Sequence, residues 1–216
     1  MLLLSCALTA NAQQRPKKMA EEEPDTIPLL KHIAVSVDLV GPIQWAVSTN
    51  GQVEAQLRID LKDKYYPVLE LGYGHADASE VATGLHYKTN APYGRIGMDW
   101  NLLKNKHDVY RLFAGFRYAF TSYKFDVNST TPITDPTYGG VSPYEATGIS
   151  ASYHWLEGVM GIDAKIWGPI HFGWSFRYRR RIAHKDGDIG NTWYVPGFGK
   201  QGASRMGLTF NVGVEF

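Results

Sequence analysis

The sequence has one cysteine, Cys6, and no run of about 18 or more uncharged apolar residues. Without such a run, a transmembrane helix is excluded. A single cysteine cannot form a disulfide within the chain. Neither sign of charge dominates, because 22 Lys and Arg stand against 21 Asp and Glu, so nothing in the balance points to a nucleic-acid partner.

The composition is rich in residues typical of β structure: 22 Gly, 13 Tyr, 9 Phe and 6 Trp among 216 residues. The mean hydropathy of −0.26 is that of an average soluble protein. A membrane β-barrel has the same average, because its strands alternate apolar and polar residues. Mean hydropathy therefore does not exclude a barrel.

The first residues resemble a secretory signal peptide. Leu2 to Leu8 form a short apolar core, and Ala10-Asn11-Ala12 is a small-x-small cleavage site. We expect a signal peptide over residues 1–12, truncated because it has no positive segment, and its removal would take Cys6 with it. A lipoprotein box at residues 3–6 is the alternative, although Leu4 fits it poorly. Residues 13–31 are polar and predict a flexible periplasmic arm.

From His32 onward the hydrophobic period is two. In residues 51–62, Val53, Ala55, Leu57 and Ile59 share one face, and polar residues share the other, as in a half-buried strand. The same alternation predicts strands at 32–41, 51–62, 64–74, 93–103, 108–122, 150–166, 169–181 and 204–216.

The predicted connections alternate between short and long. The segments 62–64, 104–107 and 167–169 are short, whereas 42–50, 75–92, 123–149 and 182–203 are long and rich in turn-forming residues. Short turns at one end and long loops at the other predict an all-β fold, an eight-stranded antiparallel up-and-down transmembrane β-barrel over residues 32–216. A soluble sandwich has no reason to segregate loops in this way, and a lipocalin-like barrel would point its apolar residues inward.

If the apolar face meets lipid, the polar face supplies charges to the lumen. The predicted lumen charge network comprises Asp38, Glu54, Asp60, Glu70, Asp99, Glu157, Asp163 and Glu215 with Arg58, Arg95, Arg111, Arg117, Lys165, Arg177, Arg179 and Arg205. A barrel of this strand number has room inside only for side chains. These acids and bases must therefore pair with one another or with bound water.

The last strand alternates apolar and polar residues up to the terminal aromatic Phe216, with Phe210, Val212 and Val214 on the same face. This pattern resembles the signal by which the barrel-assembly machinery recognises outer-membrane proteins. The whole predicted layout resembles eight-stranded barrels of the OmpA and OmpX type, and beyond them a family of small Gram-negative outer-membrane proteins built on a domain of unknown function. The resemblance implies integral outer-membrane location, with both termini periplasmic and the long loops extracellular, and it implies no activity.

Some eight-stranded barrels modify lipid A, and one such deacylase family uses a His-x-Ser pair facing the membrane. Here Ser152 and His154 occur in the reverse order, without an evident acid on the same face. A nucleophile and base remain the alternative interpretation, against the simpler one of polar residues at the headgroup boundary. His75, His86 and His184 are scattered, so we expect no metal site and no cofactor.

Arg180 is the candidate contact for lipopolysaccharide phosphates, because it lies on the outward face within the basic run 177–181. The alternative is that this run neutralises lumen acids and continues into solvent. The long loops also carry aromatic residues that either anchor a partner or pack against one another above the barrel: Tyr138, Tyr144, Trp193, Tyr194 and Phe198.

The sequence thus predicts a non-enzymatic outer-membrane barrel with a structural or protein-interaction role, acting as an accessory subunit of a larger outer-membrane complex. Its expected partners are outer-membrane lipid and lipopolysaccharide, the barrel-assembly machinery during insertion, and proteins of that complex. The alternative is a lipid A-modifying enzyme that uses Ser152 and His154. The strand number and the balanced lumen charges disfavour a pore.

Overall fold

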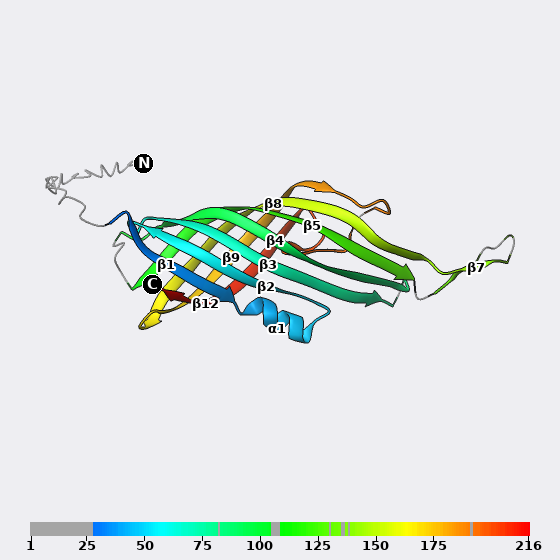
Figure 1. The fold of residues 1–216 in the computed structure, drawn as a ribbon, viewed down its shortest axis with the longest axis horizontal. Coiled ribbons are helices and arrows are strands. Elements are labelled where there is room, and N and C mark those ends of the chain that lie inside the picture. The colour runs from blue at the N-terminus through cyan, green and yellow to red at the C-terminus, as the bar shows by residue number, and fades with distance from the viewer. Residues whose placement is uncertain are drawn as a thin grey trace, which may run out of the picture.

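The computed structural model describes residues 28–81, 83–104, 109–129, 131–134, 137, 139–190 and 192–216. The predicted signal peptide, most of the predicted arm, Tyr138 and most of the 104–107 turn lie outside these residues. The described chain forms a closed barrel in the order β1-β12-β9-β8-β5-β4-β3-β2 (Figure 1). Its strands are β1 (Leu30–Asp38), β2 (Asn50–Leu61), β3 (Tyr65–Glu80), β4 (Leu85–Asn101), β5 (Tyr110–Ser129), β8 (Glu145–Trp167), β9 (Ile170–Lys185) and β12 (Ser204–Glu215). The predicted fold class is confirmed.

The first and last strands close the barrel. β1 pairs with β12 from Ala34 opposite Glu215 to Asp38 opposite Asn211. Ile33 and Phe216 exchange backbone hydrogen bonds of 3.1 and 2.9 Å at the end of this ladder. The C-terminus and the start of β1 therefore lie together at the end of the barrel that carries the short turns (Figure 1).

The barrel wall is apolar outside and charged inside. In β2, Val53 is 44% exposed whereas its neighbour Glu54 is 2% exposed, and this alternation continues through Leu57 and Arg58. A lipocalin-like barrel has the opposite arrangement, so that alternative is wrong.

The outward apolar belt has a defined outer margin. On β5 the outward side chains are apolar up to Phe120 and then polar at Ser122 and Lys124. On β8, Ser150 and Ser152 mark the same margin. The stretch of β5 from Tyr110 to Phe120 matches the roughly 9–11 residues with which a tilted strand crosses a bilayer.

Several strands continue far beyond this margin, which corrects the predicted loops. Residues 75–80 and 85–92, predicted as loop, belong to β3 and β4, and residues 123–129 and 145–149 of the predicted loop 123–149 belong to β5 and β8. β6 (Ile133–Thr134) and β7 (Val141–Ser142) form a small ladder between β5 and β8. The prediction failed here because outward positions beyond the belt meet water and carry no apolar residue, so the hydrophobic alternation stops although the ladder continues.

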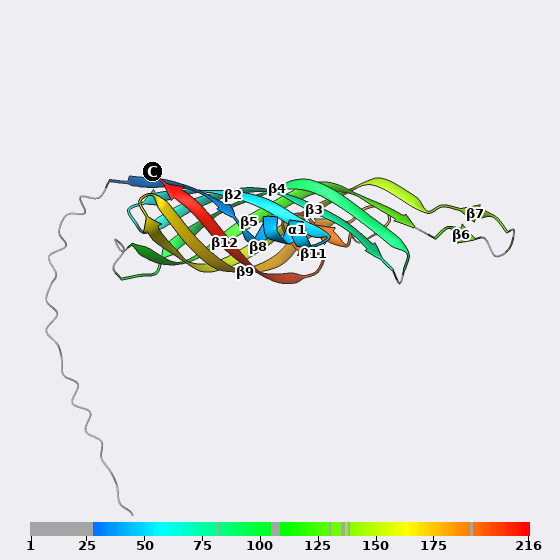
Figure 2. The same cartoon turned by 90° about the horizontal axis from the view of Figure 1, so that it is seen from below.

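The part of β3, β4, β5 and β8 that extends past its neighbours is called the projecting sheet here, and it comprises residues 77–80, 85–89, 125–129 and 145–151. β2 pairs with β3 only as far as Ala76, and β9 pairs with β8 only from Ser152. In Figures 1 and 2 these strands run past the rest of the barrel at the end away from the C-terminus.

The predicted loop 42–50 is mostly a helix, α1 (Val40–Val47), and the predicted strand 32–41 ends at Asp38. The Asp38 carboxylate accepts hydrogen bonds from the backbone N–H groups of Val40 and Gly41, which turns the chain into the helix. Trp45 stacks on His75 of β3, with ring centroids 5.3 Å apart. No helix in the described part of the chain is long and apolar enough to cross a membrane.

Candidate functional site

Buried glutamates and arginines fill the middle of the lumen. Glu70, on β3, has no exposed surface and contacts arginines from three other strands. Arg177 Nη1 lies 2.7 Å from Glu70 Oε2, and Arg95 Nη1 and Arg117 Nε lie 3.1 Å from its carboxylate oxygens. Three cations around one carboxylate would be unfavourable alone, so further acids are needed nearby.

Glu54 and Glu157 supply those acids. Glu157 Oε1 lies 2.9 Å from Arg95 Nε and 3.3 Å from Arg179 Nε. Glu54 pairs with Arg95 and lies 3.4 Å from Arg177 Nη2. These residues come from β2, β3, β4, β5, β8 and β9. We call the cluster the central charge layer, and it comprises Glu54, Glu70, Arg95, Arg117, Glu157, Arg177 and Arg179.

A second group of charges lies toward the short-turn end. Asp99 joins it to the central layer, because its carboxylate is 2.7 Å from Arg117 Nη1 and 3.8 Å from Arg58 Nη2. Arg58 pairs in turn with Asp163, and Arg111 pairs with Glu215. His171, which was not predicted as a lumen residue, lies 3.3 Å from both Asp163 and Glu215.

Some of the residues predicted to belong to the lumen charge network have other contacts or positions. Asp38 accepts a hydrogen bond from Phe210 N, besides those that start α1, and so joins β1 to β12. Arg205 donates to the carbonyl oxygens of Lys200 and Gln201, at 2.8 and 3.4 Å. Lys165 is exposed at the barrel end rather than buried in the lumen, which corrects that assignment. Asp60 accepts the backbone N–H of Asp63 in the β2–β3 turn.

Neutral side chains that complete the charge layer were also missed. Gln56 donates to Glu70 at 3.0 Å, the Tyr93 hydroxyl donates to Glu54 at 2.7 Å, and Trp155 Nε1 donates to Glu157 at 2.6 Å. Each lies on the same strand face as a predicted charge, so strict alternation along the strand is the signal that could have found them.

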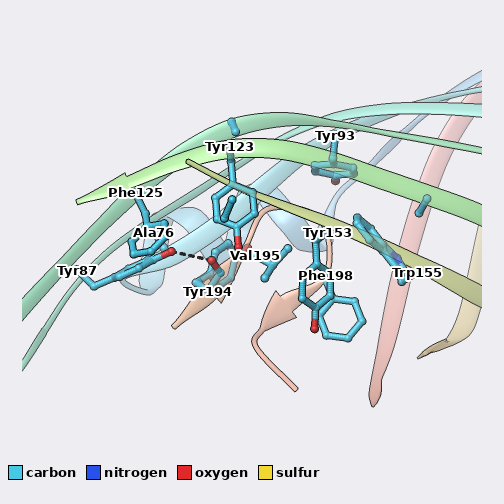
Figure 3. Close-up of a cluster of buried hydrophobic side chains, with 13 residues drawn as sticks. Ala76, Tyr87, Tyr93, Tyr123, Phe125, Tyr153, Trp155, Tyr194, Val195 and Phe198 are labelled. Atoms are coloured by element: carbon cyan, nitrogen blue, oxygen red, sulfur yellow. Dashed lines mark hydrogen bonds between the residues drawn. The ribbon is translucent and has the colours of Figure 1, made fainter. Parts of the chain in front are cut away.

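Beyond the charge layer, residues 194–200 fill the outer half of the lumen with the buried aromatic side chains Tyr194 and Phe198. We call this segment the aromatic plug. Residues 182–185 of the predicted loop 182–203 continue β9, and the later part of the loop folds back into the barrel, where β10 (Tyr194–Val195) pairs with β11 (Gly199–Lys200). Phe198 has no exposed surface and packs on Tyr153 and Trp155, with centroid distances of 4.9 and 5.7 Å (Figure 3).

For Tyr194 and Phe198, burial in the plug corrects the prediction that the loop aromatics anchor a partner or pack above the barrel, whereas Trp193 is exposed. Tyr194 is 2% exposed, and burial raises the pKa of its phenol. Its carbonyl oxygen accepts a hydrogen bond of 2.8 Å from the Tyr87 hydroxyl on β4 (Figure 3). Gly197 makes the tight approach possible, since its φ of +80° favours glycine and a Cβ there would overlap the Tyr93 ring.

Two cavities open from this arrangement. The outer cavity, about 720 Å³, lies between the projecting sheet and the plug. Its apolar lining comprises Leu85, Tyr87, Val127, Tyr144, Ile189 and Trp193. The second, about 930 Å³, lies beside α1 and is lined by both outward and lumen-facing residues of β12 and β9.

The other candidate residues are dispersed. His154 Nδ1 lies 2.8 Å from the Tyr118 hydroxyl, and within the described chain Ser152 makes no hydrogen bond to His154. Arg180 is exposed on β9, opposite Ser204. His75 stacks on Trp45, whereas His86 and His184 lie 3.4 Å from Asp77 and Asp186 respectively.

The fold is similar to solved outer-membrane barrels at low sequence identity. Ail of Yersinia pestis, solved with the heparin analogue sucrose octasulfate, is 9% identical with a TM-score of 0.42, over 86% of this chain and 98% of that one. Neisserial surface protein A is 10% identical with a TM-score of 0.43, over 87% and 96%. A major outer-membrane protein from Thermus thermophilus is 12% identical with a TM-score of 0.41, over 87% and 99%.

No curated protein matches the sequence. A family model does match it, and the expected membership of a family built on a domain of unknown function is confirmed. The model described as "Domain of unknown function (DUF6048)" matches residues 1–216, so the chain belongs to the DUF6048 family.

Proposed function

We propose that this chain is a non-enzymatic barrel of the outer membrane that binds another protein through its projecting sheet, as an accessory subunit of a larger outer-membrane complex. The apolar belt and the charged interior support a membrane location, because only lipid favours that arrangement of faces. In the proposed orientation both termini are periplasmic and the projecting sheet is extracellular.

The single observation that carries the proposal is the projecting sheet itself. On β8, residues 145–151 pair with β5 on one side and have no pairing strand on the β9 side among the described residues. An unpaired edge is a template for an extended segment of a partner. The adjacent outer cavity offers apolar lining to side chains of that segment, including the exposed Leu85 and the half-buried Tyr144.

The filled lumen favours an interaction role for the barrel rather than transport through it. The charge layer fills the middle of the lumen and the plug its outer half, and the cavity between Arg58 and Asn211 has a volume of only about 20 Å³. A barrel so filled acts through its outer surfaces.

The test is purification of the tagged full-length chain from outer membranes in mild detergent. We expect a partner at stoichiometric amount, lost in Leu85→Asp because a charge in the outer cavity opposes apolar contact. Val81→Asp is the matched control, since Val81 lies at the β3–β4 hairpin tip, is 95% exposed and does not line the cavity. Recovery as a lone monomer, or equal loss in both variants, would overturn the proposal.

A photo-crosslinking residue tests the location independently. Placed at Tyr144, it should give one discrete heavier product, whereas at the belt residue Leu156 it should give none. Crosslinks only from Leu156 would move the interface into the membrane and contradict a role for the projecting sheet.

A further inference from the structure

The barrel wall is incomplete beside α1. β12 residues 204–209 pair with β9, but β1 accompanies β12 only as far as Asp38, opposite Asn211. The last backbone hydrogen bond between these two segments runs from Leu39 N to Phe210 O, at 2.7 Å. Beyond it the chain turns into α1, which lies on the side of the barrel beside β12 (Figure 2).

The cavity of about 930 Å³ occupies this gap, and we call it the seam slot. Its outer part is lined by apolar residues of the belt and of the helix, namely Val40, Ile43, Val47, Phe176, Met206 and Leu208. Its inner part is lined by polar residues, namely the buried Arg179, the partly buried Gln52 and Arg205, and the exposed Lys200. The slot thus runs from the apolar exterior to a polar, basic interior.

The charge of the inner part is positive. Asp38, which also lines the slot, already accepts hydrogen bonds from backbone N–H groups of Val40, Gly41 and Phe210. Arg179 is paired with Glu157. Within the described chain, Lys200 and Arg205 have no carboxylate partner: Lys200 Nζ lies 5.3 Å from the Trp193 ring centroid, and Arg205 donates to backbone carbonyls.

The depth of the slot matches the margin of the belt. Leu208 lies opposite the outward Phe176, and Met206 opposite Tyr178, whereas the next outward position along the ladder pairs Ser204 with Arg180. The apolar part is therefore at acyl-chain depth, and Lys200 and Arg205 are near the headgroups.

We propose that the seam slot binds lipid A, with an acyl chain between α1 and β12 and a phosphate on Arg205 and Lys200. Guanidinium groups bind phosphate through paired charge-assisted hydrogen bonds. The assignment to lipid A rests on the proposed orientation, which places this end of the belt in the outer leaflet. The site is distinct from Arg180, which lies on the outer face of β9 and does not line the slot.

Native mass spectrometry of the purified full-length barrel, with lipid A or phosphatidylglycerol added in detergent, tests the site. We expect one retained lipid A, and Lys200→Gln with Arg205→Gln to weaken retention about tenfold, equivalent to roughly 1.4 kcal/mol. Arg205→Lys should retain the lipid, because it keeps the positive charge while losing the guanidinium hydrogen bonds to the carbonyl oxygens of Lys200 and Gln201. This variant therefore separates the effect of charge from the effect of those hydrogen bonds. Arg180→Gln should have no effect.

A matched pair of variants tests the part of the slot that would hold the acyl chain. Leu208→Trp fills the slot and should displace the lipid, whereas Leu156→Trp enlarges an outward leucine of β8 away from the slot and should not. Equal retention in all variants would mean annular lipid only, and preference for phosphatidylglycerol would overturn lipid A as the occupant. Displacement by inorganic phosphate would mean a site for the free anion.

These results are separable from those for the protein-interaction proposal. The slot variants should leave co-purification of a partner unchanged, and Leu85→Asp should leave lipid retention unchanged. If Leu85→Asp and the slot variants both abolish lipid retention, the barrel has been disrupted as a whole and the seam slot is not a discrete site.

Discussion

At the scale of single residues, the lumen shows how a barrel this narrow tolerates so many ionised groups. Glu70 is surrounded by Arg95, Arg117 and Arg177, and each of these arginines also reaches a second acid. A buried charge is tolerated when its partners are fixed and themselves compensated. The barrel ladders fix those partners, because each strand contributes inward side chains at a set register.

Removing the central acid should therefore be costly. Glu70→Ala leaves the guanidinium groups of three arginines undercompensated, and we expect the free energy of unfolding to fall by about 3–5 kcal/mol. Urea unfolding in lipid vesicles measures it. Lys165→Ala is the control, because Lys165 is exposed, and its effect should stay within about 0.5 kcal/mol. A loss in Glu70→Ala no larger than the control would mean that the arginines find other partners.

At the scale of elements, the sequence predicted the strands that cross the membrane, but it did not predict α1 or the aromatic plug. Hydrophobic alternation located all the barrel strands, since lipid demands an apolar outward face at every second position. α1 was missed because its residues Val40–Val47 carry no polar side chain other than Gln44 and so show no helical period. The plug was missed because the burial of Tyr194 and Phe198 depends on contacts with distant strands, which local pattern does not encode.

Packing of α1 on β2 depends on Gly51. A Cβ at Gly51 would overlap the backbone of Trp45, so Gly51→Val should displace the helix. We expect faster hydrogen–deuterium exchange across residues 39–49 and a loss of about 1–3 kcal/mol in stability. Gly158→Val is the matched control, because a Cβ at Gly158 on β8 meets no atom within 4 Å. Equal exchange in both variants would show that α1 does not need this contact.

At the scale of the whole molecule, the candidate sites lie where the regular barrel ends. The charge layer could be expected from the strand faces. The seam slot could not, because it exists only where β1 ends opposite Asn211 while β12 begins at Ser204. Strand register of this kind depends on both partners together. The outer cavity likewise joins Leu85 with Trp193, which are distant in the sequence and meet only through the closed topology.

The charge layer and the aromatic plug both block the lumen, and this leads to a prediction about conductance through the barrel. The charge layer and the aromatic plug occupy different depths, so weakening one leaves the other in place. Single-channel recordings in planar bilayers should show no steady conductance for the natural sequence, and none for Phe198→Ala, although that variant should lose about 3–5 kcal/mol of stability because it empties a fully buried aromatic site. Conductance in Phe198→Ala alone would mean that the plug is the real barrier and that water and ions pass among the paired charges. Conductance in the natural sequence would contradict the sealed lumen itself, and with it the reason for assigning function to the outer surfaces.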